Sequence, residues 1–200
     1  GKAYGKVIND LYEAGCRNIQ LDDCTWGMMA DKSGHFAYGT TQEGLIEIQK
    51  AHKDINNKVI ANAPKDIVIN THVCRGNFHS TYANSGAYDP VADILFGEEN
   101  VDAYDLEFDD ERSGGFEPLA KVSGDKKVVL GLITTKSPKL ENKEEVIARI
   151  HEAEKYIPLD RLYLSPQCGF ASCEIGNKLT EEEQWAKLTL VKKIAKEVWG

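Results

Sequence analysis

The chain has 200 residues and a formal net charge of −8 at pH 7, with 42% hydrophobic and 28% charged residues. This composition is typical of a globular protein, and the length is sufficient to bury a substantial core. The acidic balance argues against a nucleic-acid-binding surface, which needs an excess of basic residues. No apolar run reaches the length of a membrane-spanning helix, and the first residues lack an apolar signal segment. We therefore expect a cytoplasmic protein that binds neither nucleic acid nor membrane.

The sequence contains five cysteines, an odd number. Thiols in the cytosol stay reduced, so disulfides are not the expected use of these residues. Metal binding or catalysis is the better expectation for any cysteine that falls near histidine or carboxylate side chains.

Short apolar runs alternate with amphipathic segments along the chain, beginning with a helix at 6–14 that Gly15 closes. The runs that predict strands lie at 19–21, 67–69, 104–106, 128–133 and 161–164. Three later helices carry a capping residue followed three positions later by glutamate: Thr40 with Glu43, Asn142 with Glu145, and Thr180 with Glu183. Residues 90–96 have room for a short helix only, and 33–41 read as a long loop.

Strands that alternate with helices predict a parallel sheet covered by helices. An open doubly wound sheet would have a glycine-rich phosphate loop after its first strand, but here that strand runs into Asp22-Asp23-Cys24-Thr25-Trp26. A (β/α)8 barrel instead collects reactive residues at the carboxyl ends of its strands, which is the pattern of this chain. Only about five of the eight units fit into 200 residues. We therefore expect an α/β fold in which residues 1–200 form the C-terminal part of a single TIM-type barrel domain.

Polar residues that can bind a metal follow three of the predicted strands. His72 and Cys74 are two residues apart on extended backbone, so their side chains point the same way. Glu107 ends the third strand, and Cys168 follows the fifth between proline and glycine. One imidazole, two sulfurs and one carboxylate suit tetrahedral zinc. A buried Cys74 that packs as a small apolar residue is the alternative for the His-x-Cys pair taken alone.

These residues belong to motifs that resemble the C-terminal barrel of cobalamin-independent methionine synthase. Four separated motifs occur in the order of that family: Thr71-His72-x-Cys74, a strand ending in Glu107 shortly before Arg112-Ser113, Lys136-Ser137-Pro138, and Ser165-Pro166-x-Cys168-Gly169. The resemblance extends from about residue 19 to residue 168. It is closer to the short, single-barrel relatives than to the long two-barrel enzyme.

The resemblance implies roles for individual residues. In that family the histidine, the two cysteines and the glutamate bind zinc, which implies that His72, Cys74, Glu107 and Cys168 bind Zn²⁺ here. The segment 19–23 resembles the family's Gln-x-Asp-Glu-Pro, in which the first aspartate holds the amino group of homocysteine. Asp22 is therefore the implied substrate-binding residue, with a turn-capping role as its alternative.

Three departures from the family pattern bear on the methyl donor. Cys24 stands where the family has proline, and Met28 stands where the long enzyme has a glutamate that contacts folate. Lys136 replaces a histidine assigned as general acid, which makes Lys136 the candidate general acid of this chain. That role needs a strongly depressed lysine pKa. A solvated or anion-pairing lysine is the alternative.

The function implied by the resemblance is zinc-dependent transfer of a methyl group from a methyl-folate-type donor to the thiol of homocysteine, which forms methionine. Two alternatives remain open from the sequence. A related zinc barrel could transfer an alkyl group to another thiol, such as one of the coenzyme M type. The chain could also be a truncated, non-catalytic zinc-binding barrel, or a homo-oligomer that completes its barrel with a second copy, because free sheet edges favour association.

Overall fold

The computed structural model describes residues 1–200 and contains one sheet of five parallel strands. The strands are β1 (Asn18–Asp22), β2 (Val68–Val73), β3 (Ala103–Glu107), β4 (Lys127–Ile133) and β5 (Leu162–Pro166). Their order in the sheet is β1-β2-β3-β4-β5, so every strand pairs with the one that follows it in sequence. A doubly wound sheet reverses this order at a switch point, whereas a TIM-type barrel does not. The sheet therefore has the winding of five consecutive strands of a barrel.

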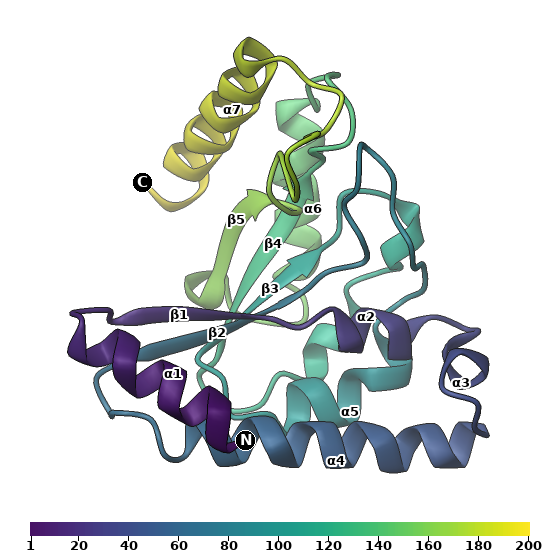
Figure 1. The fold of residues 1–200 in the computed structure, drawn as a ribbon. Helices are drawn as coiled ribbons and strands as arrows, with labels where there is room; N and C mark the ends of the chain where they lie inside the picture. Colours follow the sequence, from purple (N-terminus) through teal and green to yellow (C-terminus); the bar gives the residue numbers. More distant parts are fainter.

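Seven α-helices accompany the sheet, and Figure 1 shows them grouped by the strands that they cover. They are α1 (Lys2–Glu13), α2 (Cys24–Ala30), α3 (Gly34–Ala37), α4 (Gln42–Ile60), α5 (Asp89–Glu98), α6 (Lys143–Ala153) and α7 (Glu181–Trp199). In Figure 1, α4 runs below the β1–β2 end of the sheet with α1 and α5 beside it, whereas α6 and α7 lie at the β4–β5 end. No helix is both long enough and apolar enough to cross a bilayer.

The starts of α2, α4, α6 and α7 follow the capping chemistry of the sequence. Thr180 and Glu183 form a complete capping box at α7, and Asn142 accepts a hydrogen bond from the backbone N–H of Glu145 at α6. The prediction for α4 was wrong by one residue. Thr41 rather than Thr40 is its N-cap, because the Thr41 hydroxyl lies 3.2 Å from the backbone nitrogen of Gly44.

Other elements differ from the sequence prediction. The first strand ends at Asp22, and Asp23 caps a short helix, α2, that starts at Cys24. The segment 33–41, expected to be a loop, contains α3, and α5 has ten residues where a shorter helix was expected. Between β3 and β4 there is no α-helix but two 3₁₀ turns, η1 (Glu111–Ser113) and η2 (Glu117–Lys121). A third, η3 (Leu159–Arg161), precedes β5.

The two faces of the sheet differ in polarity, because side chains alternate along each strand. On β3, Tyr104 and Leu106 are fully buried beneath the helices and belong to a core of 27 residues. The intervening residues, Asp105 and Glu107, point to the opposite face. At the free edges, Asn18 of β1 and Tyr163 of β5 are exposed. The apolar face of the sheet packs into the core. The opposite face carries the polar side chains.

Candidate metal centre

Four side chains from three strand ends converge at the carboxyl rim of the sheet. Ligand atoms of His72, Cys74, Glu107 and Cys168 all lie within 4.8 Å of one another. His72 lies on β2 and Cys74 follows it, Glu107 ends β3, and Cys168 follows β5. The parallel arrangement brings these positions together although they lie far apart in sequence. The structure thus brings together the four residues that the sequence placed at strand ends, and their binding of a metal stays a prediction.

The imidazole of His72 is held in a defined orientation. Its Nδ1 lies 3.1 Å from the backbone oxygen of Asp105, and because a carbonyl oxygen only accepts, Nδ1 must donate. The whole His72 side chain is buried, with the residue 7% exposed, and its Nε2 has no hydrogen-bond partner. A neutral imidazole with Nε2 unprotonated is the form that binds a metal, with the other ring nitrogen tied to a backbone carbonyl.

The two thiols of the cluster are electrostatically coupled. A hydrogen bond from the Cys74 thiol lowers the pKa of Cys168 well below its ordinary value. The same bond between the sulfurs raises the pKa of Cys74. All five cysteines of the chain are free thiols. Two adjacent sulfurs that compete for one proton are suited to a divalent cation, which would bind both as thiolates.

Glu107 is a fully buried carboxylate that already has two donors. The backbone N–H of Arg75 lies 2.9 Å from Oε1, and the guanidinium of Arg112 lies 2.8 Å from Oε2. Tyr88 fixes the backbone at this point, because its hydroxyl accepts from the Glu107 N–H at 3.1 Å. Arg112 also binds Asp109 at 2.9 Å. Sequence reasoning noted the Arg-Ser pair only as a motif and missed the ion pair with Glu107.

An open pocket of about 390 Å³ adjoins the cluster. His72 and Cys168 form part of its wall, and Asp22, which pairs with His72 across β1 and β2, lines it as well. Lys136 is not among the lining residues. Its Nζ is buried and has no hydrogen-bond partner. The structure therefore brings Asp22 to the metal cluster but does not bring Lys136 into this pocket.

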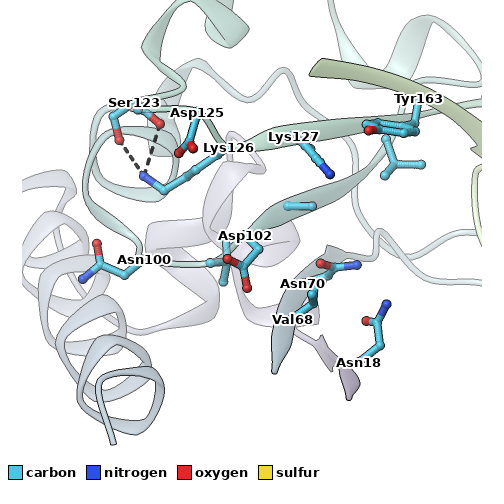
Figure 2. Close-up of a pocket in the computed structure, with 14 residues that line it drawn as sticks. Asn18, Val68, Asn70, Asn100, Asp102, Ser123, Asp125, Lys126, Lys127 and Tyr163 are labelled. Atoms are coloured by element: carbon cyan, nitrogen blue, oxygen red, sulfur yellow. Dashed lines mark hydrogen bonds between the residues drawn. The ribbon is translucent and has the colours of Figure 1, made fainter. Parts of the chain in front are cut away.

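A larger pocket, of about 670 Å³, lies at the opposite end of the strands and is drawn in Figure 2. Its wall includes the first residues of four strands, Asn18, Val68, Ala103 and Lys127. Figure 2 shows Lys126 turned back onto Ser123, whose hydroxyl lies 2.6 Å from its Nζ. Barrel enzymes react at the carboxyl ends of their strands, so the smaller pocket is the candidate site.

The loops that carry the cysteines are fastened together by amide side chains that the sequence did not reveal. Asn177, in the loop after β5, donates to Asn77 Oδ1 at 2.8 Å and to the Thr135 carbonyl at 2.9 Å. Asn77 donates to the backbone oxygen of Gly169 at 2.6 Å, next to Cys168. These bonds connect the loops after β2, β4 and β5. We call Asn77, Thr135 and Asn177 the loop clamp.

The donor set fits zinc. It offers one nitrogen, two sulfurs and one carboxylate oxygen, which are the ligands of tetrahedral zinc sites. The free, buried Nε2 of His72 is the observation that favours a metal most directly, because a buried polar atom without a partner is costly.

The comparisons with known proteins agree with the geometry. The family model described as "Cobalamin-independent synthase, Catalytic domain" matches residues 1–197. The chain is 50% identical over 202 residues to the uncharacterized protein YxjG of Bacillus subtilis (strain 168), an alignment that covers 99% of this chain and 53% of YxjG.

Two solved structures have the same fold. The vitamin B12-independent methionine synthase assigned in Listeria monocytogenes matches with a TM-score of 0.77 and 38% identity, over 100% of this chain and 54% of that one. A B12-independent methionine synthase from Shewanella sp. W3-18-1 matches with a TM-score of 0.69 and 21% identity, over 98% and 52% of the two chains. The chain thus spans about half the length of these relatives. From the motif order, the strand winding and the family match together, the chain belongs to the cobalamin-independent methionine synthase family.

Proposed function

We propose that this chain carries the zinc-binding, thiol-activating part of a methyltransferase that moves a methyl group from a methyl-folate-type donor to homocysteine and forms methionine. The observation that carries the proposal is the convergence of His72, Cys74, Glu107 and Cys168 within 4.8 Å beside an open pocket. A zinc ion bound by these residues would hold the substrate sulfur as a nucleophilic thiolate near neutral pH.

The chain's own residues have separate parts in this proposal. His72 presents Nε2 because Asp105 holds Nδ1, and the sulfurs of Cys74 and Cys168 would supply negative charge to a bound zinc ion. Asp22 lines the pocket and is an exposed carboxylate, so it is suited to bind the ammonium group of an amino-acid substrate. Cys168 and Asp22 then line the same pocket, which would orient the substrate thiol toward the ion.

Lys136 is proposed as the proton donor to the leaving amine of a methyl-folate-type donor. Its support is the buried Nζ without a partner, which is an uncommon state for a lysine. Because Lys136 does not line the pocket, the lysine side chain would have to reach the donor from the neighbouring loop. Among the site residues named here, only Lys136 is proposed to act on the methyl donor.

We propose further that residues 1–200 are the C-terminal part of a single barrel domain. The free edges of β1 and β5 each present an unpaired row of backbone groups. The relatives are about twice as long as this chain, which supports pairing of these edges with further strands of the same barrel. A second copy of the chain would be the other way to cover them, and size in solution distinguishes the two.

Metal analysis of the purified chain, paired with a methyl-transfer assay, tests the function. We expect the wild type to bind one zinc ion per chain. Cys168→Ser should bind zinc with an affinity at least tenfold lower. Cys173→Ser is the matched control, because Cys173 is exposed and lies outside the cluster. Homocysteine should be methylated from methyl-folate by the wild type, and Lys136→Ala should lose this turnover while keeping its zinc. If Cys168→Ser binds as much zinc as the wild type with the same affinity, the proposed metal centre is contradicted.

A further inference from the structure

The loop after β3 places a second buried carboxylate near the side chain of Glu107. Asp109 follows the end of the strand by two residues, and its side chain is only 1% exposed. The guanidinium of Arg112 joins the two carboxylates, because its Nη2 donates to Glu107 Oε2 at 2.8 Å and to Asp109 Oδ1 at 2.9 Å. The Arg112 side chain is itself 5% exposed. Two buried carboxylates therefore share one nitrogen of a buried cation.

Contacts from two loops fix Arg112 in this position. Asp110 caps η1 by accepting a hydrogen bond from the Arg112 N–H at 2.9 Å, and the Arg112 carbonyl accepts from the Gly86 N–H at 2.8 Å. The guanidinium carbon lies 4.8 Å from the centre of the Tyr82 ring, within the range of a cation–π contact. Gly86 and Tyr82 belong to the loop after β2, which also carries Cys74. Arg112 is thus held beside Glu107 from both sides.

The charges of this group bear on whether Glu107 can bind a cation. A guanidinium orients a carboxylate through a charged hydrogen bond, but its positive charge also opposes a metal ion at that carboxylate, and burial strengthens the opposition. Asp109 brings a negative charge to the same guanidinium nitrogen. Two carboxylates and one guanidinium leave a net charge of −1, which is the charge of Glu107 alone.

Asp110 also pairs with Arg112, through Nη1, but its situation is different. The Asp110 side chain is 50% exposed, so water screens its charge. The buried charge of Asp109 is screened much less. Asp109 rather than Asp110 is therefore the residue that offsets the guanidinium at Glu107.

We propose that Asp109 is a positioning residue of the metal centre that acts through Arg112. It balances the guanidinium charge, so that Arg112 holds the Glu107 carboxylate in place without weakening its attraction for a divalent cation. The inference rests on the metal centre of the proposed function and keeps all four of its ligands. Asp109 is not one of the residues whose ligand atoms lie within 4.8 Å of one another, so its effect on the ion is indirect.

Zinc affinity of the full chain, measured by competition with a chromophoric chelator, tests this role. We expect Asp109→Asn to bind zinc roughly tenfold more weakly, because the uncompensated guanidinium then draws on Glu107. Asp110→Asn is the matched control. It makes the same change on the half-exposed partner of the same arginine, asparagine also caps a helical turn, and the affinity should stay at the wild-type value.

A double-mutant cycle shows whether Asp109 acts through Glu107. Loss of any negative charge near a cation would weaken zinc binding in every background. The proposed route predicts instead that Asp109→Asn has no further effect on zinc affinity in a Glu107→Gln chain. Asp109→Glu, which keeps the charge, should retain most of the wild-type affinity.

Each variant is checked for folding by circular dichroism. Asp109→Asn should fold, because Arg112 keeps Glu107 and Asp110 as partners. If it does not fold, Asp109→Ser, a smaller neutral replacement, takes its place in the cycle.

The outcomes separate this inference from the proposed function. Wild-type zinc affinity in the neutral Asp109 variant, or an equal loss of affinity with glutamate and with glutamine at position 107, would overturn the role of Asp109 and leave the four-residue centre standing. A wild-type chain that binds no zinc would overturn both. A loss of affinity that requires Glu107 and is absent from Asp110→Asn supports the inference.

Discussion

Glu99 is a fully buried carboxylate at the end of α5, in a polar cluster apart from the metal centre. Asn56 donates to Glu99 Oε1 at 2.6 Å and to Asp23 Oδ2 at 3.0 Å, and His52 Nε2 lies 2.7 Å from the same Asp23 oxygen. Burial raises the pKa of Glu99 to about 7. Burial also acts to raise the pKa of Asp23, but the hydrogen bond and charge of His52, together with hydrogen bonds from Asn56 and Thr25, lower that pKa.

Glu99 should make the free energy of unfolding depend on pH. Its pKa is raised from 4.5 to about 7 in the folded chain, so the folded state binds the proton more tightly than the unfolded state. The stabilisation of the folded state that comes from this tighter proton binding is therefore fully present below pH 4.5 and is lost as the pH rises through 7. Glu99→Gln keeps an acceptor for Asn56 and cannot ionise, so it should be more stable than the wild type by about 3 kcal/mol at pH 8 but not at pH 4.5.

Urea unfolding at the two pH values measures this difference. Glu98→Gln is the control, because Glu98 is the exposed neighbour on the same helix turn, paired with Lys53. If Glu99→Gln changes stability by the same amount at both pH values, ionisation of Glu99 is not the cause.

At the level of single residues, the sequence was sufficient where the chemistry is local. His72 and Cys74 share a strand face, and Glu107 and Cys168 follow strand ends, so the parallel sheet brings them together. The half-buried pair of Asp23 with His52 could not be predicted, because it joins residues 29 apart, the N-cap of α2 and a residue of α4.

The loop clamp shows how elements rather than single ligands hold the candidate site. Asn77, Thr135 and Asn177 join three loops, and Thr135 and Asn77 both donate to the Gly169 oxygen, at 3.0 and 2.6 Å. Residues His79 and Ser80, in the loop after β2, have positive φ angles of 46° and 65°. Ser80 N donates to Asn177 Oδ1 at 2.8 Å, which stabilises this uncommon backbone.

Removal of the clamp should weaken metal binding without removing a ligand. We expect Asn177→Ala to lower zinc affinity by roughly 10- to 100-fold, because the loop with Cys168 is no longer fixed against the loop with Cys74. Competition with a chromophoric chelator measures the affinity. Lys178→Ala is the matched control, because this exposed neighbour uses only its backbone N–H in the contact with Ser80. Equal affinities for both variants would show that the clamp does not position the cysteine.

Elements were predictable where the sequence carries a cap and a regular apolar pattern, as in α6 and α7. The crossover from β3 to β4 was not, because Gly114, Gly115 and Pro118 interrupt any helical pattern and the chain folds into 3₁₀ turns. Helix α2 was missed because it has only seven residues, too few to show a period.

For the whole molecule, metal binding should raise thermal stability. A ligand at about 1,000 times its Kd stabilises the state that binds it by about 4 kcal/mol. For a chain of this size that corresponds to a rise in Tm of roughly 10 °C. Differential scanning calorimetry with zinc and with a chelator measures the shift, and Cys168→Ser should show little of it. Identical Tm values in the two conditions for the wild type would contradict a centre built by folding.

The winding of the sheet was predictable as a whole, because strand and helix patterns alternate and reactive residues recur at strand ends. The pairing of the first and last strands was not, because the free edges of β1 and β5 have no partner within these 200 residues. The alternation of apolar and polar residues in the sequence predicts which side chains share a face of the sheet. It does not predict which strands or chains pair with the edge strands.

The separation of the candidate metal ligands along the chain sets an order of events during synthesis. When the segment through residue 107 has emerged from the ribosome, only His72, Cys74 and Glu107 exist, and Cys168 is still to be translated. A nascent chain at that stage offers the ion an incomplete and solvent-open set of donors. Under the proposed function, the ion can therefore be bound by all four residues only after Cys168 has been translated and β5 has paired with β4.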